Sequence, residues 1–365
     1  MNDILEFSNL GDNDLSDIEL KNNLKSCLFL KYYNSLKNHK DIIDNYIKEW
    51  DNFKKYMNPY ELIYSPYQKN MNTSQYKPIS RSFFKMWEML HKFNLLEIDD
   101  NIVIGNIAEG PGGFIEAILR YRQFNNKDVY ISNTLYPSDK SIPSWNKLNR
   151  YKDERKIDNI NILYCDLYNY KNLIKYISYF KDKKAYLVTA DGGFDYSSDF
   201  NNQEYSSSRI IYSEIVCAFS IQELGGNFVI KIFDTFNIFT LKCIYLLYKF
   251  YKTISLYKPL TSRVANSEKY IICKGFKGIN YKLLIKFLDS INNFPTGNPD
   301  ISTIKLPNEF IYQFDNYNKL FVDNQISFID KTLEMIKNKD PIDFEKIVEE
   351  QVVKAKEWCE EYNFK

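Results

Sequence analysis

Four charged residues stand out by their types and by their order along the chain. They are two lysines and two carboxylates, namely Lys85, Asp191, Lys231 and Glu268. Each falls beside the end of a predicted α/β sheet, where side chains from different elements can meet. Because burial and a second nearby cation lower the pKa of a lysine, Lys231 could act as a base beside Lys85. The carboxylates would orient the lysines, so the set suits removal of a proton from a hydroxyl.

Taken singly, each of the four has an ordinary structural explanation. Lys85 could be an exposed helix lysine and Lys231 a lysine of an edge strand. Asp191 could be a turn residue, and Glu268 one partner of a surface ion pair. Their joint occurrence at the ends of the sheet favours one shared site.

A glycine-rich turn follows the first strand of the predicted sheet. Residues 107–114 read Ile-Ala-Glu-Gly-Pro-Gly-Gly-Phe. The glycines allow a ligand to approach the backbone, and the helix that follows offers free amides to an anion. The spacing differs from Gly-x-Gly-x-x-Gly and favours the methionine-and-ribose cradle of S-adenosylmethionine enzymes, with a purely structural turn as the alternative. Asp166, after the third strand, could accept a hydrogen bond from an adenine amino group or cap a helix.

The elements that must position these residues alternate between strand and helix. Strands are expected at 101–107, 128–135, 160–165, 185–189 and 227–232, and helices at 81–93, 112–122, 168–180 and 205–224. Apolar strands that alternate with helices predict a parallel sheet covered on both faces.

The pattern changes after a helix at 236–251. Two strands at 253–257 and 269–274 follow with no helix between them, which predicts a hairpin. The expected fold is therefore a Rossmann-like α/β sheet, mostly parallel with a final antiparallel strand.

Helical segments are expected on both sides of this sheet. Residues 20–36 and 42–50 have the spacing of amphipathic helices, and the end of the chain is also typical of helices. The chain is thus predicted to divide into a helical segment 1–54, an α/β domain 55–278 and a helical extension 279–365.

The charge, the cysteine and histidine content and the apolar segments of the chain argue against several classes of protein. The net charge of +1 does not indicate a polyanionic partner, but eight basic residues against one acid between Lys242 and Lys277 could bind phosphates or simply form a solvated face. Six scattered cysteines and two histidines argue against a zinc site. The sequence has no signal segment and no apolar run of membrane length, so a soluble intracellular protein is expected.

Several segments, together with the Lys-Asp-Lys-Glu tetrad, carry a resemblance to a known family. They are residues 58–61, 80–85, 110–114, 190–194, 225–234 and 258–270. The last reads Lys-Pro-Leu-Thr-Ser-Arg-Val-Ala-Asn-Ser-Glu-Lys-Tyr. The sequence resembles the FtsJ/RrmJ-type ribose 2′-O-methyltransferases, and more narrowly the cap-specific mRNA (nucleoside-2′-O-)methyltransferases, over residues 55–278.

The resemblance implies a Rossmann-like methyltransferase that uses S-adenosyl-L-methionine, requires no metal and methylates the first transcribed nucleotide of capped mRNA. The tetrad residues match the family's catalytic positions. Residues that match the donor site are Ser80, Asn106, Ala108, Glu109, Gly110, Pro111, Gly112, Gly113, Phe114, Leu135 and Asp166. Residues that match positions in contact with RNA or cap are Arg81, Asn201, Gln203, Arg263 and Asn266.

Two donor-site residues depart from the family's pattern. Asn106 stands where the family usually has an acidic residue, and Glu109 replaces a small residue. Glu109 could itself hold the amino group of the donor.

Three functions remain open at this stage. The first is methylation of capped mRNA, with other capping enzymes as partners, and the second is methylation of an internal ribose of rRNA or tRNA. The third is a catalytically silent RNA-binding subunit. The A/T-biased composition would suit a large DNA virus, acting in host cytoplasm or virion, or a protist, with the protein in nucleus or cytoplasm.

Overall fold

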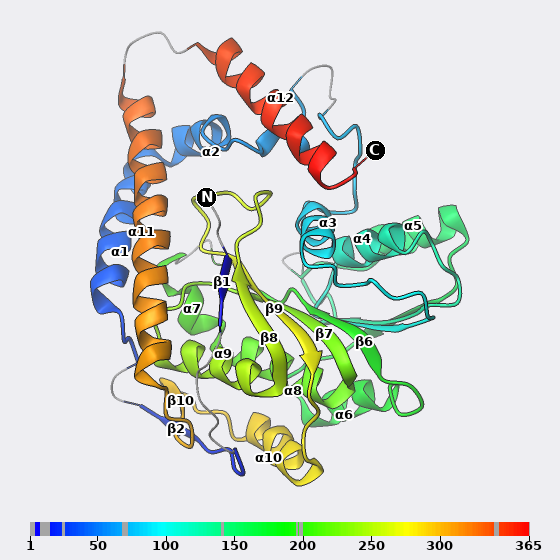
Figure 1. The fold of residues 1–365 in the computed structure, drawn as a ribbon. Helices are drawn as coiled ribbons and strands as arrows, with labels where there is room; N and C mark the ends of the chain where they lie inside the picture. Colours follow the sequence, from blue (N-terminus) through cyan, green and yellow to red (C-terminus); the bar gives the residue numbers. More distant parts are fainter. Residues whose placement is uncertain are drawn as a thin grey trace.

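The computed structural model describes residues 4–7, 15–23, 26–67, 72–139, 142–194, 196, 200–338 and 343–364. A large sheet forms its centre (Figure 1). The eight strands of this sheet are β1 (Ile4–Glu6), β3 (Val103–Ile107), β4 (Val129–Thr134), β5 (Ile160–Tyr164), β6 (Ala185–Ala190), β7 (Gln222–Ile232), β8 (Tyr251–Tyr257) and β9 (Lys269–Phe276).

The strand order is β1-β8-β9-β7-β6-β3-β4-β5. Strands β5, β4, β3, β6 and β7 pair in parallel, whereas β9 is antiparallel to both β7 and β8. The mostly parallel sheet with a final antiparallel strand and the hairpin of β8 and β9 are therefore confirmed. The structure adds β1, which pairs antiparallel with β8 at the edge of the sheet.

Helices cover both faces of the sheet. They are α3 (Ser82–Lys92), α4 (Gly113–Tyr121), α5 (Asn146–Arg155), α6 (Tyr170–Ser178), α7 (Gln203–Ser206), α8 (Ser208–Ile221), α9 (Ile238–Phe250) and α10 (Tyr281–Asn292). In β7, Val229 packs into the hydrophobic cluster of α3 and α4, while Phe228 and Ile230 pack into the cluster of α8 and α9. Successive side chains of a strand point to opposite faces, so one apolar strand serves both layers.

The flanking segments pack against this α/β unit. They comprise α1 (Leu30–Ile43), α2 (Ile47–Tyr56), the long α11 (Asn308–Lys337) and α12 (Phe344–Glu361), besides the short turns η1 (Asp44–Tyr46), η2 (Glu61–Ile63) and η3 (Phe200–Asn202). Helix α1 lies against α11, and α12 extends past α2 towards α3 (Figure 1). Among the described residues, none of the helices combines the length and the apolar character needed to cross a bilayer.

The local structure differs from the expectations in the N-terminal segment, at α5 and at residues 222–224, which belong to β7 and not to the expected helix 205–224. Residues 20–36 were expected to form one helix, but β2 (Leu20–Asn22) pairs antiparallel with β10 (Pro299–Ile301), and α1 begins only at Leu30. A three-residue strand is stabilised by its partner, which lies far away in sequence, and local periodicity cannot reveal it. Helix α5 was not predicted, because its sequence is polar and has little apolar periodicity.

Candidate active site

The four predicted catalytic residues meet at the carboxyl ends of the parallel strands. Asp191 directly follows β6, Lys231 is next to last in β7, Glu268 precedes β9, and Lys85 comes from α3. The Nζ of Lys85 lies 2.6 Å from Oε1 of Glu268. The Nζ of Lys231 lies 3.1 Å from Oδ1 of Asp191 and donates a hydrogen bond of 2.8 Å to the backbone oxygen of Asp191. The tetrad therefore consists of two ion pairs.

A tyrosine joins the two ion pairs. The hydroxyl of Tyr270, a fully buried residue of β9, lies 3.2 Å from Oδ1 of Asp191 and 3.2 Å from Oε1 of Glu268. It can donate its proton to either carboxylate. Tyr270 was not predicted as a site residue, although it lies two residues after Glu268 and therefore on the same face of the chain.

The protonation of Lys231 differs from the sequence-based expectation. Burial lowers the pKa of this lysine, but Asp191, Glu268 and Glu214 raise it, and the net shift is upward. Lys85 and Lys231 in turn outweigh the burial of Glu268 and lower the pKa of that carboxyl to about 2. Since the acids around Lys231 outweigh its burial, Lys231 carries a proton at neutral pH. The expectation of a lowered lysine pKa was wrong.

A further buried carboxyl group supports the turn after β6. Oε1 of Glu214, on α8, accepts a hydrogen bond of 3.0 Å from the backbone N–H of Gly192, and burial raises the pKa of Glu214 to about 8. A Cβ at Gly192 would lie 2.2 Å from the same oxygen. Glu214 thus holds the chain directly after Asp191 and lies close enough to Lys231 to influence its charge. Sequence reasoning missed it, because a carboxyl on an apolar helix had no visible partner.

The glycine-rich turn links β3 to α4 and leaves no room for larger side chains. A Cβ at Gly110 would lie 2.7 Å from the backbone oxygen of Pro143, and one at Gly113 would lie 2.2 Å from the hydroxyls of Ser80 and Ser82. Gly112 has a φ of 112°, a conformation that favours glycine. Close packing within the protein therefore requires glycine at these positions, and Ser80 lies beside the turn.

Glu109 lies within this turn with one oxygen free. Its Oε1 accepts a hydrogen bond of 2.7 Å from the backbone N–H of Phe114, whereas its buried Oε2 has no partner among the described residues. Burial, followed by the charge of Asp191, raises the pKa of Glu109 well above its ordinary value. A buried, unpaired carboxyl oxygen suits a ligand that brings a cation or a hydrogen-bond donor. The residues of this turn therefore fit S-adenosylmethionine, whose amino group is such a partner.

The other predicted donor-site residues differ in how their polar groups are used. The amide of Asn106 donates to Thr189 Oγ1 at 2.8 Å and accepts from Ser132 Oγ at 2.9 Å, so it ties β3 to both neighbouring strands. Asp166 Oδ1 accepts from the backbone N–H of Tyr168 at 2.9 Å, a bond within the turn before α6, whereas the N-cap of α6 is Asn169.

Two more predicted donor-site residues, Ala108 and Leu135, lie at the same end of the sheet. Ala108 has a positive φ of 52° at the start of the turn, and Leu135, just after β4, is 42% exposed. Leu135 and Asp166 follow neighbouring strands, so they lie at the same sheet edge as the turn.

Two arginines predicted to contact RNA have partners within the chain. Arg263 forms hydrogen bonds of 2.9 and 2.5 Å with the buried carboxylate of Glu61. Arg81 donates to the hydroxyl of Tyr64 at 3.1 Å and lies 4.2 Å from the centre of its ring. The Tyr64 hydroxyl donates in turn to Glu61 at 3.0 Å, so both arginines belong to one network. Glu61 was not proposed as a site residue, although its segment contributed to the family resemblance.

The predicted polar contacts with RNA do not all lie together. Ser267 donates from its hydroxyl to Oε1 of Gln203 at 2.7 Å, which links Gln203 to the loop that carries Asn266. Asn201 instead donates to Oδ1 of Asp41, on α1, at 3.1 Å. Gln203 and Asn266 are therefore next to the tetrad, while Asn201 faces the N-terminal helix.

Glu88 connects three parts of the chain behind the site. It lies one turn after Lys85 on α3 and is fully buried. Its carboxyl oxygens accept five hydrogen bonds, from the hydroxyl of Tyr257, the backbone N–H of Leu260, the backbone N–H and hydroxyl of Thr261, and Nε1 of Trp358. Trp358 belongs to α12, so the C-terminal helix is bonded to the helix that carries Lys85.

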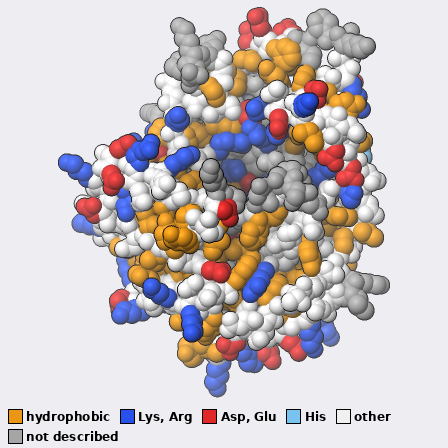
Figure 2. All heavy atoms as spheres, turned by 180° about the vertical axis from the view of Figure 1, so that it is seen from behind, with side chains coloured by type: hydrophobic (Ala, Val, Ile, Leu, Met, Phe, Trp, Pro, Cys, Tyr) orange, Lys and Arg blue, Asp and Glu red, His pale blue; other side chains and the backbone are white. Residues whose placement is uncertain are grey.

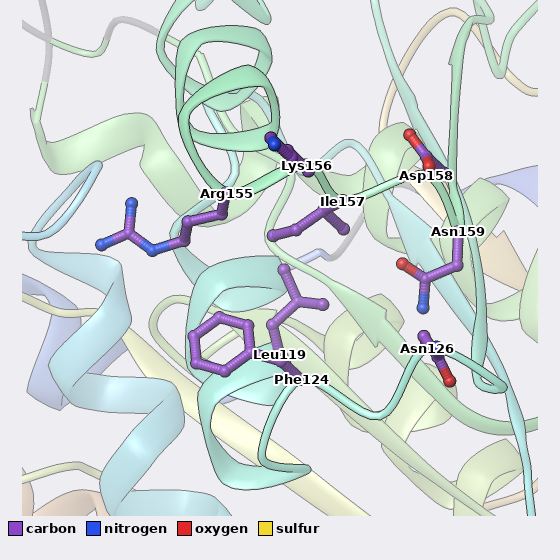
Figure 3. A pocket seen from close by; sticks show the side chains of 8 residues that line it. All are labelled: Leu119, Phe124, Asn126, Arg155, Lys156, Ile157, Asp158 and Asn159. Atoms are coloured by element: carbon purple, nitrogen blue, oxygen red, sulfur yellow. The ribbon is translucent and has the colours of Figure 1, made fainter.

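The surface has hollows in more than one place. On the face drawn in Figure 2, Lys and Arg side chains gather around a hollow in the upper half of the molecule. A separate pocket of about 700 Å³ is lined by Leu119, Phe124, Asn126, Arg155, Lys156, Ile157, Asp158 and Asn159 (Figure 3). Asn126 and Asn159 precede β4 and β5, so this pocket lies at the amino end of the strands, opposite the tetrad.

Within the described parts of the chain, no group of three or more His, Cys, Asp or Glu side chains could hold a metal ion. That the reaction requires no metal stays a prediction.

Comparison with known proteins gives consistent matches. The family model described as FtsJ-like methyltransferase matches residues 78–276. Mouse "Cap-specific mRNA (nucleoside-2'-O-)-methyltransferase 1" is 30% identical over 265 residues, which cover 69% of this chain and 31% of the mouse protein. Caenorhabditis briggsae "Inactive cap-specific mRNA (nucleoside-2'-O-)-methyltransferase 1B" is 27% identical over 263 residues, which cover 67% of this chain and 31% of that protein. The chain thus spans about a third of the length of these curated relatives.

Among solved structures, one described as a ribosomal RNA methyltransferase from Plasmodium falciparum is similar to this chain with a TM-score of 0.42 and 19% identity. The match covers 55% of this chain and 99% of the Plasmodium chain.

Proposed function

The chain belongs to the FtsJ-like methyltransferase family, and from this premise we propose that it methylates the ribose 2′-hydroxyl of the first transcribed nucleotide of capped mRNA. The observation that carries the proposal is the pair of bridged ion pairs, Lys231 with Asp191 and Lys85 with Glu268, beside a glycine turn. Such a site can hold a hydroxyl and its proton acceptor next to a bound methyl donor. The cap preference is proposed from the named relatives, which are cap-specific.

S-adenosylmethionine, when bound at the turn, would supply the activated methyl group and a positive sulfonium charge. Glu109 would pair with the amino group through Oε2, which has no partner among the described residues, and the backbone from Gly110 to Gly113 would contact the rest of that end. Leu135 and Asp166, at the ends of the neighbouring strands, would contact the adenine end. The amide of Asn106 already forms hydrogen bonds with both neighbouring strands, so Asn106 would support the donor site by holding these strands together.

Lys231 would accept the proton of the 2′-hydroxyl as the hydroxyl oxygen bonds to the methyl carbon, and S-adenosylhomocysteine would leave with the electron pair of the broken carbon–sulfur bond. Because its pKa is raised, Lys231 must first release its own proton. A positive charge nearby lowers the pKa of a lysine, so binding of the positively charged sulfonium donor would favour that release. Lys85 would steer the hydroxyl, and Asp191 would orient Lys231. Correct placement for in-line displacement can contribute about 7–11 kcal/mol to lowering the barrier.

The substrate would enter on the side of the 258–268 loop. Arg81, Gln203, Arg263 and Asn266 would contact RNA on this side, and Asn201 would contact it farther out, towards α1. Positive side chains around the hollow in Figure 2 are consistent with a phosphate backbone as ligand. Other capping enzymes are the partners that a cap substrate implies.

The proposal is tested by methyl transfer from labelled S-adenosylmethionine to short RNAs that are identical except for the cap. Lys231→Ala is compared with Lys252→Ala, which removes an exposed lysine of β8. Transfer to capped RNA alone, lost only in the Lys231 variant, is the expected result. Transfer to uncapped RNA would instead establish internal ribose methylation.

One comparison favours a second candidate function. The C. briggsae relative is described as inactive, so a catalytically silent RNA-binding subunit is compatible with this degree of similarity. Binding of capped RNA and S-adenosylmethionine without any transfer would support that alternative.

A further inference from the structure

Helix α11 reaches the catalytic loops from outside the segment that matches the family. Three inward-facing residues of this helix, Asn318, Phe321 and Gln325, are spaced to lie on one face. Asn318 exchanges hydrogen bonds of 2.6 and 2.9 Å with Thr235, just beyond β7. Gln325 Nε2 donates to the backbone oxygen of Ala265 at 2.5 Å. Helix α11 is thus hydrogen-bonded to the loop after β7 and to the 258–268 loop, which both border the tetrad.

Phe321, between these two anchors, lies against two buried lysines. The Nζ of Lys269 is 3.7 Å from the centre of the Phe321 ring, and the Nζ of Lys258 is 5.5 Å from it. Lys269 is fully buried, and Lys258 is 6% exposed. The negative face of an aromatic ring attracts such cations, and more strongly when water is excluded.

Both lysines bind backbone oxygens next to Glu268. Lys258 Nζ donates to the carbonyl oxygens of Asn266 at 2.6 Å and Glu268 at 3.0 Å. Lys269 Nζ donates to the carbonyl oxygen of Ser267 at 3.1 Å. Three consecutive carbonyl groups are therefore held by two ammonium groups, and these residues carry the tetrad acid and the predicted RNA contact Asn266.

Burial works against the charge of both lysines, although Lys269 Nζ also lies 3.5 Å from Oδ1 of Asp234. Burial lowers the pKa of Lys258 to about 7 and that of Lys269 to about 8. Lys258 is influenced by Glu268 and Asp234, which raise its pKa, and by Lys269 and Lys85, which lower it. Lys269 is influenced by Asp234 and Glu204, which raise its pKa, and by Lys40, which lowers it. An aromatic ring stabilises an ammonium group without adding another formal charge to this cluster.

We propose that Phe321 is a positioning residue of the methyl-transfer site, whose ring attracts the ammonium groups of Lys258 and Lys269 so that they hold Asn266, Ser267 and Glu268 in place. The inference rests on the proposed function, because it assigns these loop residues to binding and orienting RNA. It gives the C-terminal extension a direct part in the site.

The test replaces Phe321 with pentafluorophenylalanine, which keeps the shape of the ring and reverses the charge distribution that attracts cations. Phe321→Tyr keeps the ring face and should behave as wild type. Leu320→Ala is the matched control, because Leu320 is the preceding residue of α11 and is 46% exposed. The expected result is a rise of roughly fivefold in KM for capped RNA in the fluorinated protein alone.

Thermal unfolding provides a second readout that does not depend on activity. The fluorinated protein should be less stable than wild type below pH about 7, where both lysines are charged, and the difference should disappear above pH about 8. A difference that is equal at all pH values, or absent together with an unchanged KM, would overturn the inference. If wild type transfers no methyl group, the proposed function fails, and the pH dependence of unfolding still decides the role of Phe321.

Discussion

Lys231 of β7 is paired in register with Tyr270 of β9. This antiparallel pairing sets the proposed base opposite the hydroxyl that lies between Asp191 and Glu268. The register of this strand pair therefore sets the position of Lys231 relative to the hydroxyl of Tyr270.

Methyl transfer should increase with pH in the alkaline range. The pKa of Lys231 is raised by the surrounding acids, so the neutral amine needed to accept a proton becomes more abundant as pH rises. Lys231→Arg should lower kcat by about 10²–10⁴-fold, because a guanidinium does not lose its proton. The pH profile of kcat measures both effects. A flat profile in the alkaline range would contradict the assignment of Lys231 as base.

Tyr270→Phe should lower kcat roughly tenfold with little change in KM. The substitution removes the hydroxyl between Asp191 and Glu268 but keeps the ring, so the effect acts on the alignment of the ion pairs. Tyr251→Phe is the control, since Tyr251 is also buried in the sheet but donates to Gln222, away from the tetrad. Equal kinetics in the two variants would argue against a linking role for Tyr270.

Glu214→Gln should remove part of the pH dependence of stability. Burial raises the Glu214 pKa from 4.5 to about 8 in the folded state, so the folded protein favours the protonated form. The stabilisation is complete below about pH 4.5 and is lost as pH rises through about 8. Gln resembles the protonated carboxyl, so the variant should be the more stable protein at alkaline pH. Unfolding temperatures of both proteins across this range provide the measurement.

Binding of S-adenosylmethionine should release a proton from Glu109. The pKa of this carboxyl is raised, so it must ionise to pair with the donor's amino group. Calorimetry in buffers with different ionisation enthalpies measures the proton release. Glu109→Gln should bind about tenfold more weakly and release no proton, because its amide keeps the shape but cannot ionise. Unchanged proton release in this variant would place the ionising group elsewhere.

Glu88→Ala should destabilise the protein by about 3–5 kcal/mol, because five buried donors lose their acceptor. Denaturation by urea gives the change in the free energy of unfolding. Glu97→Ala is the control, since Glu97 is exposed and surface substitutions typically change stability by less than about 0.5 kcal/mol. A loss as small as that of the control would show that the Glu88 network contributes little.

The sequence by itself determined the main architecture and the catalytic candidates. Apolar segments that alternate with helices identified the parallel sheet, because burial on both faces requires continuous apolar character. The glycine turn and the four candidates Lys85, Asp191, Lys231 and Glu268 were also identified from short segments of the sequence. The site roles of these residues and the division of the chain into three segments remain predictions.

Tertiary structure alone decided the electrostatics of the site. The raised pKa of Lys231 depends on carboxyl groups directly after β6, on α8 and directly before β9. Glu214 and Phe321 act on residues far away in sequence, and β2 exists only through its pairing with β10. Periodicity reports whether a side chain is buried, whereas charge and hydrogen bonding depend on which distant groups lie beside it. That information appears only when the chain has folded.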